Sequence, residues 1–335
     1  SNNRISRIPQ NVFSWVSSMR RLYLDNCDLV DDGITEESFS SLSHLKYLHL
    51  SQNRLRSVPT TLPTSLEYLY LDGNEISAVG ENTFVGLPNL RSLYLQGNNL
   101  TSESLHPAAF TSLANLTSLY LSGNKMGKLD VIFPPSLEVL RLGNNSLSTI
   151  SPETFLYLPH LQKLVLSDNT LETVPRGLFS GLLSLQYLHL DNNKLVTVPA
   201  DLPKGLIHLN VADNAISAIP ASIFFRLQML VALNLSNNNL YDDRIEDLDF
   251  GYFKHLQQLQ LSGNHLTSVP RNLPKSLRYL DLQANLLSEK TANVFSQTPR
   301  LKTLNLSRNM LGDGGVVRDS FFGTTNLAYL DLSGN

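Results

Sequence analysis

Leucines recur along the whole chain with a fixed number of polar residues between them. The pattern LxxLxLxxNxL has clear copies that begin at Leu45 and at Leu185. Two leucines separated by one residue are typical of a short β-strand, in which alternate side chains point to opposite faces. We therefore expect each copy to form one short strand with its leucines directed inward and the residue between them directed outward.

The asparagine position of this pattern gives the length of each repeat. It falls at Asn3, Cys27, Asn53, Asn74, Asn98, Asn124, Asn145, Asn169, Asn193, Asn214, Asn238, Asn264, Asn285, Asn309 and Asn335. The spacings follow a cycle of 24, 26 and 21 residues, with one exception where 26 becomes 24. Self-similarity at such periods is the signature of leucine-rich repeats. It predicts one leucine-rich repeat domain of about 14 repeats over residues 1–335, uncapped at both ends.

The long and short repeats differ in the residues before the strand. Each long repeat has a phenylalanine six residues before the first motif position, which is Met19 in the first repeat and leucine in the others: Phe13, Phe39, Phe84, Phe110, Phe155, Phe179, Phe224, Phe250, Phe295 and Phe321. The short repeats lack this phenylalanine and carry a proline pair such as Pro59 and Pro63. We expect an α/β-type leucine-rich repeat solenoid with a curved parallel sheet on its concave face. Its convex side should be irregular, 3-10 or polyproline-like, with the phenylalanines buried there.

The asparagine and the lone cysteine of the pattern are expected to be structural. The asparagine amide can bond backbone groups of neighbouring turns that would otherwise be buried without partners. Cys27 occupies the same position in its repeat, so we interpret it as a buried thiol. A single cysteine also excludes a disulfide within these residues.

Composition and motifs narrow the classes of function. The chain has 26 Lys and Arg against 29 Asp and Glu, so no basic stripe for nucleic acid or heparin is expected. No apolar run is long enough to span a membrane. No phosphate loop, nucleophile elbow or HExxH motif occurs. His189 and His208 are the only plausible metal pair, and the acidic groups near Asp31 and Asp242 are interpreted as polar loops. We therefore expect no enzyme, no cofactor and no metal site.

Outward-facing strand residues carry the strongest sign of binding. Tyrosines gather on the first five strands, whereas the last six strands have Asn, Gln or Asp at the position between the inner leucines. Cross-strand packing alone can place tyrosine on a sheet, but that account predicts an even spread. We therefore predict a ligand-binding patch formed by Tyr23, Asp25, Tyr47, His49, Tyr68, Tyr70, Asp72, Tyr94 and Tyr120.

The chain resembles the small leucine-rich proteoglycans of the extracellular matrix, most closely their podocan-like branch. The resemblance rests on the three-repeat cycle, the phenylalanine column and Leu-Pro-x-Ser-Leu phrases such as Leu62 to Leu66. It implies a secreted matrix protein that binds collagen or growth factors through its concave face. In a secreted protein, Asn99, Asn115 and Asn144 are the better candidates for glycans among the five Asn-x-Ser/Thr sites.

The chain also departs from that family. The cysteine-rich segments that flank the family's repeats are not present, so we interpret the sequence as a segment of a longer protein. The alternative function is the ectodomain of a leucine-rich repeat receptor, whose membrane segment would lie beyond Asn335. The regular three-repeat cycle favours a matrix protein over a receptor of the Toll-like type, whose repeats are less regular. An intracellular scaffold is a third possibility, and it would make the glycan sites accidental.

Overall fold

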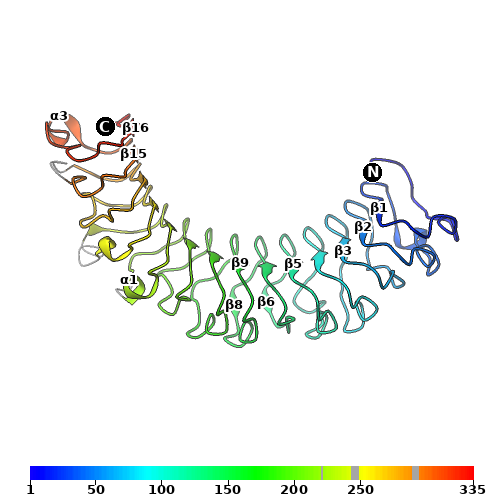
Figure 1. Cartoon of the computed structure of the whole chain (residues 1–335). Coiled ribbons are helices and arrows are strands. Elements are labelled where there is room, and N and C mark those ends of the chain that lie inside the picture. Colours follow the sequence, from blue (N-terminus) through cyan, green and yellow to red (C-terminus); the bar gives the residue numbers. More distant parts are fainter. Residues whose placement is uncertain (220–221, 243–248, 289–293) are drawn as a thin grey trace. The chain divides into compact units, whose positions relative to one another are not determined.

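The computed structural model describes residues 1–219, 222–242, 249–288 and 294–335. The chain packs as two compact units, each a coil of repeats (Figure 1). Unit 1 comprises residues 1–169 and 181–184, and unit 2 comprises residues 170–180 and 185–335. Among the described residues, no helix combines the length and the apolar character needed to cross a membrane.

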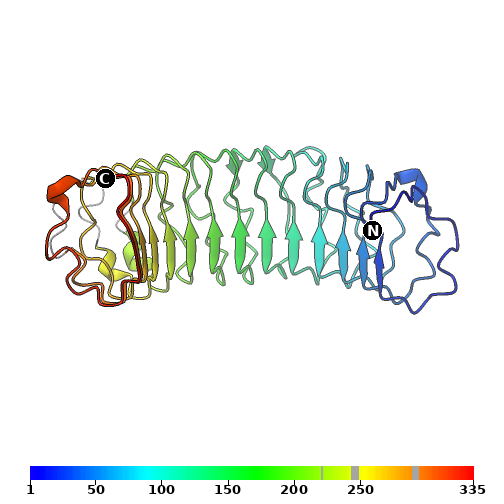
Figure 2. The ribbon, with the colours of Figure 1, turned by 90° about the horizontal axis from the view of Figure 1, so that it is seen from above.

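One face of unit 1 is a parallel sheet with one strand from each repeat, seen as side-by-side arrows in Figure 2. The register aligns the inner leucines, so that Leu22 lies beside Leu48 and Leu48 beside Leu69. Its strands are β1 (Arg21–Tyr23), β2 (Tyr47–His49), β3 (Tyr68–Tyr70), β4 (Ser92–Tyr94), β5 (Ser118–Tyr120), β7 (Val139–Arg141) and β9 (Lys163–Val165). Each of these strands has the leucine between two outward residues, as the sequence pattern predicts.

Unit 2 repeats this arrangement with the same register. Leu188 pairs with Leu209, and Leu209 pairs with Leu233. Its strands are β10 (Tyr187–His189), β11 (His208–Asn210), β12 (Ala232–Asn234), β13 (Gln258–Gln260), β14 (Tyr279–Asp281), β15 (Thr303–Asn305) and β16 (Tyr329–Asp331). In both units we call the outward side of these strands the sheet face.

The connections opposite the sheet face are mostly irregular. They contain the two-residue strands β6 (Lys128–Leu129) and β8 (Thr149–Ile150), which pair with each other in unit 1. The short helical segments are η1 (Asp31–Gly33), α1 (Ser222–Arg226), η2 (Phe250–Tyr252) and α3 (Gly312–Gly315). Parallel strands on one side and irregular or 3-10 backbone on the other confirm the expected solenoid.

Phenylalanines form a second buried column on the connection side. Of the ten predicted ones, Phe39, Phe84, Phe110, Phe155, Phe179, Phe250 and Phe295 are buried. Phe13 and Phe321 are half-buried, because each has a neighbouring repeat on one side only. The side chain of Phe224 lies outside the described residues. Burial of all ten was therefore too broad an expectation for the first and last repeats.

The short repeats fill this column in a way that the sequence pattern missed. Phe133, immediately before the proline pair of its repeat, is buried, with its ring centroid 6.4 Å from those of both Phe110 and Phe155. Leu202 and Leu273 precede a proline in the same way and are also buried. Three of the four short repeats therefore contribute a core residue from a different position, closer to the strand, and Leu62 of the fourth is half-buried.

The motif asparagines connect successive turns as predicted. The Asn74 amide donates to the carbonyl oxygens of Leu50 and Leu71 at 2.9 Å, and its Oδ1 accepts the N–H of Leu55 at 3.1 Å. The same set recurs at Asn124 and elsewhere in the stack. Cys27 is fully buried and its thiol is free, which confirms the structural interpretation of this residue.

Candidate functional site

The sheet face of unit 1 carries a continuous stack of aromatic side chains, which we call the central column. It consists of Tyr23, His49, Tyr70, Tyr94 and Tyr120, one from each of β1 to β5. Neighbouring ring centroids lie between 3.7 and 4.5 Å apart, and the three contacts from His49 to Tyr120 are within 12° of parallel. The in-register strands make this possible, because they place successive outward residues one strand spacing apart.

Arginines extend the aromatic surface at two points. The Arg141 guanidinium lies over the Tyr120 ring at 5.5 Å, so the central column continues onto β7. Beside it, a shorter side column is formed by the stacked rings of Tyr47 and Tyr68, with centroids 4.4 Å apart. Arg21 lies over Tyr47 at 4.8 Å. Each guanidinium caps a ring face through a cation–π contact.

Two carboxylates flank the column near its first strands. Asp25 and Asp72 follow the inner leucines of β1 and β3, and both are half-buried. Asp25 accepts a hydrogen bond from the Ser1 hydroxyl, and Asp72 accepts one from the Ser51 hydroxyl, each at 2.6 Å. The hydrogen bond from Ser1 holds the pKa of Asp25 below its ordinary value. The first strands of the column therefore carry two carboxylates together with the Arg21 guanidinium.

Partial burial keeps the column's ionisable rings neutral. Burial, together with the neighbouring hydroxyls of Tyr120 and Tyr70, raises the pKa of Tyr94 well above its ordinary range. Burial also raises the pKa of Tyr70. It lowers the pKa of His49, although Asp25 and Asp72 act in the opposite direction. The stack is thus a neutral aromatic surface.

This geometry bears on both interpretations of the tyrosines. The faces of the rings pack against the faces of neighbouring rings, as expected if the tyrosines serve only to pack the strands. The ring edges remain for solvent or for a partner, and Tyr23 at the first strand is 49% exposed. The predicted patch is therefore brought together on one face, where it offers a row of hydrogen-bonding ring edges.

The sheet face of unit 2 has a different chemistry that the sequence pattern did not explain. Five of its Asn and Asp residues use Oδ1 to accept the backbone N–H two residues further on, at 2.9 to 3.2 Å: Asn210, Asn234, Asp281, Asn305 and Asp331. Such side chains form a turn that satisfies the backbone where the strand ends. These Asn and Asp side chains, which we call the polar column, therefore stabilise their own repeat. In the sequence, the only sign of this role is the presence of Asn or Asp at the last residue of the strand.

The histidines of unit 2 do not converge on a metal site. His208 stacks on Tyr187 with ring centroids 4.9 Å apart. His189 lies in the neighbouring column, with Nδ1 at 3.9 Å from Asp191 Oδ1. Within the described ranges, no three His, Cys, Asp or Glu side chains are placed to hold a metal ion.

The three predicted glycan sites lie in unit 1 and differ in accessibility. Asn115 and Asn144 are exposed, and Asn99 is half-buried. The Asn115 amide donates to the carbonyl oxygen of Pro88 at 2.9 Å, a bond that a glycan would have to replace. The three glycan sites remain predictions.

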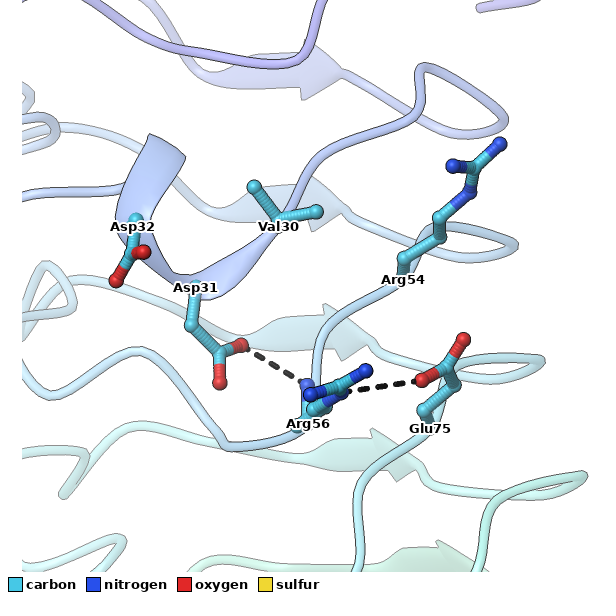
Figure 3. A pocket seen from close by; sticks show the side chains of 6 residues that line it. All are labelled: Val30, Asp31, Asp32, Arg54, Arg56 and Glu75. Atoms are coloured by element: carbon cyan, nitrogen blue, oxygen red, sulfur yellow. Dashed lines mark hydrogen bonds and ion pairs between the residues drawn. The ribbon is translucent and has the colours of Figure 1, made fainter.

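A polar pocket of about 460 Å³ lies beside the connection of the second repeat of unit 1 (Figure 3). Its charges largely face one another: Arg56 Nε is 3.3 Å from Glu75 Oε2, and Arg54 pairs with Asp28 at 3.0 Å. Asp31 accepts the backbone N–H of Arg56 at 2.9 Å. In unit 2, Asp242 accepts the N–H of Thr267 in the same manner. These aspartates connect repeats, as expected of polar loops; Asp243, Glu246 and Asp247 lie outside the described residues.

Similarity to known proteins agrees with this architecture. The leucine rich repeat family model matches residues 64–126, 135–195, 204–266, 254–311 and 275–335. Podocan of Mus musculus is 36% identical over 336 residues, and Podocan-like protein 1 of Homo sapiens is 36% identical over 334 residues. Both alignments cover 100% of this chain, but 55% and 52% of those proteins. The chain therefore spans about half the length of the curated relatives it matches.

Solved structures show the same fold. The octameric complex of Latrophilin 3, Unc5D and FLRT2 contains a chain that matches with a TM-score of 0.65 and 25% identity. That match covers 91% of this chain and 79% of the other. The expected resemblance to podocan-like small leucine-rich proteoglycans is confirmed by the two alignments that span this whole chain. By its repeats, its fold and the family model, the chain belongs to the leucine-rich repeat family.

Proposed function

We propose that this chain is part of a secreted extracellular matrix protein that binds collagen or a signalling protein through the sheet face of unit 1. The observation that carries the proposal is the central column. The five stacked rings of unit 1 form a ridged, neutral surface with hydroxyls along it. Tyrosine is enriched at protein interfaces, because it combines an apolar body with a hydrogen-bonding tip.

Collagen suits this surface better than a charged polymer does. A triple helix presents backbone carbonyls along an extended rod, and tyrosine hydroxyls can donate to such groups. A polyanion would meet Asp25 and Asp72 at one end of the column. The similarity to podocan and podocan-like protein 1 supports a role of the matrix type.

The experiment compares fibrillar collagen binding by the wild type and by a triple variant at Tyr70, Tyr94 and Tyr120, each changed to Ala. Surface plasmon resonance measures the affinity, and circular dichroism checks that the fold survives. If these residues are hot spots, each change weakens binding by about 1–3 kcal/mol. The matched control is Lys128→Ala on the exposed connection side, which leaves the affinity unchanged. Equal affinity of the folded triple variant and the wild type would show that the tyrosines pack between strands and do not bind collagen.

The second candidate function is the ectodomain of a cell-surface receptor. The likeness to a chain of the Latrophilin 3, Unc5D and FLRT2 complex favours it, since that match covers most of both chains. The two functions place the natural full-length protein in different compartments. Fractionation of cells that express that protein separates them: a matrix protein is recovered from medium and matrix, and a receptor from membranes.

A further inference from the structure

The basic end of the central column has no acidic residue among its outward side chains. The residues of β5, β7 and β9 that face outward are Ser118, Tyr120, Val139, Arg141, Lys163 and Val165. Arg141 and Lys163 lie on paired strands, where Val139 is the register partner of Lys163. Two cations therefore share this part of the sheet face.

Arg141 is held in place without an acceptor. Its guanidinium is half-buried over the Tyr120 ring. In the part of the chain that the structure describes, no carboxylate pairs with it, and its Nε–H is buried without a hydrogen-bond partner. Burial of an unpaired cation costs free energy that an incoming anion can offset. Burial and repulsion from Arg141 also lower the pKa of Lys163.

A carboxylate lies further along the column, between Arg141 and the Arg21 guanidinium of β1. Asp72 follows β3, which is three strand-to-strand steps from β7. With strands spaced by about 4.8 Å, the two poles lie roughly 14 Å apart along the column. An extended, polyproline-like chain advances about 3.1 Å per residue, so it covers this span in about five residues.

We propose that the sheet face of unit 1 recognises an extended peptide segment with an acidic and a basic side chain about five residues apart, the acidic one on Arg141 and the basic one on Asp72. The residues between them lie over Tyr70, Tyr94 and Tyr120. The partner is a peptide rather than a sulfated polysaccharide, since a uniform polyanion would be repelled by Asp72 and Asp25. This inference rests on the proposed function, because it assumes that the ligand lies along the central column.

Blocked synthetic peptides test the charge spacing directly. The probe has one Lys and one Glu five residues apart, joined by prolines. The comparison peptides have the same charges two residues apart, or Gln in place of Glu. Isothermal titration calorimetry with the whole chain is expected to show binding about five to ten times tighter for the five-residue spacing than for either comparison peptide.

Charge exchange identifies the residue that contacts the acid. Arg141→Glu weakens binding of the Lys and Glu peptide, and a peptide with Lys at both positions restores it. Arg141→Gln, which keeps a polar side chain, weakens binding without this rescue. Arg176→Glu changes the net charge equally at an exposed site of unit 2 and has no effect.

Three results would overturn the inference: no measurable binding of any peptide, equal binding of the two spacings, or equal loss in Arg141→Glu and Arg176→Glu. These outcomes are separate from the collagen experiment. If the triple tyrosine variant loses collagen binding while the peptides show no spacing preference, the charge spacing is wrong and the proposed binding face stands.

Discussion

The two units share an interior and differ on their sheet faces. Both bury motif leucines in register, and both satisfy their backbones with asparagines such as Asn74 and Asn238. In unit 1 the outward residue of successive strands is an aromatic ring packed on the next ring. In unit 2 it is mostly an Asn or Asp that bonds its own backbone. The same repeat therefore supports two kinds of surface. In unit 1 the outward side chains pack across strands and present a row of aromatic ring edges, and in unit 2 they close their own turns.

The largest effects are expected where the units are alike. Phe155→Ala in unit 1 and Phe250→Ala in unit 2 should each lower the free energy of unfolding by about 3–5 kcal/mol, because both rings are fully buried. Urea unfolding measures the loss. Phe322→Ala, at a side chain that is 67% exposed, is the control and should change stability by about 0.5 kcal/mol or less. A much larger loss in one unit than in the other would break the claim of a common interior.

An intermediate effect is expected at the polar column of unit 2. Asn234→Ala removes the acceptor of the Ser236 N–H, a bond of 3.0 Å, and should cost about 1 kcal/mol of stability. Collagen binding should be unchanged, since this side chain serves its own turn. Asn239→Ala, at an exposed position five residues on, is the control for stability. If Asn234→Ala weakens collagen binding at unchanged stability, the polar column is part of the binding face.

The smallest effect is expected from His49 in the central column. Burial lowers its pKa, so the folded state binds a proton less readily than the unfolded state. The unfolded state therefore holds more protons in the window from the ordinary histidine value of about 6.5 down to the lowered pKa, and stability rises with pH there. The contribution of His49 is complete above that window and falls as the pH drops through it.

Thermal unfolding at pH 7.5 and pH 5 measures this dependence. His49→Gln should reduce the difference between the two midpoints, whereas His255→Gln, at an exposed histidine of unit 2, should not. An unchanged pH difference in His49→Gln would show that the stacked ring titrates as it does in the unfolded chain.

The sequence was sufficient for the parts of the fold that periodicity controls. The leucine register, the buried Phe155 and the structural Cys27 all follow from repeat positions, because stacking forces equivalent residues into equivalent places. Phe133 was missed because it enters the same column from a different position in its repeat, immediately before Pro134. A fixed spacing cannot reveal such a replacement.

The candidate site was predictable as a set of residues but not as a surface. The cluster of tyrosines was visible in the sequence, whereas the stacking of their rings depends on side-chain conformation. The same holds for Arg141, which continues the stack across the change from tyrosine to arginine. The turn-closing role of Asn234 also needed the three-dimensional structure, because the sequence does not show whether an asparagine amide is solvated or hydrogen-bonded to the backbone.

Oxidative footprinting with and without bound collagen tests the central claim most directly, because tyrosines in both units report on their own surroundings. Tyr23 in unit 1 is 49% exposed and Tyr329 in unit 2 is 55% exposed, so the two form a matched pair. Mass spectrometry of the peptides gives the oxidation rate at each. The account predicts that collagen slows oxidation of Tyr23 and of Tyr70, Tyr94 and Tyr120, while Tyr329 and Tyr279 react as in the free protein. Protection of the unit 2 tyrosines alone, or binding that leaves the central column unprotected, would contradict it.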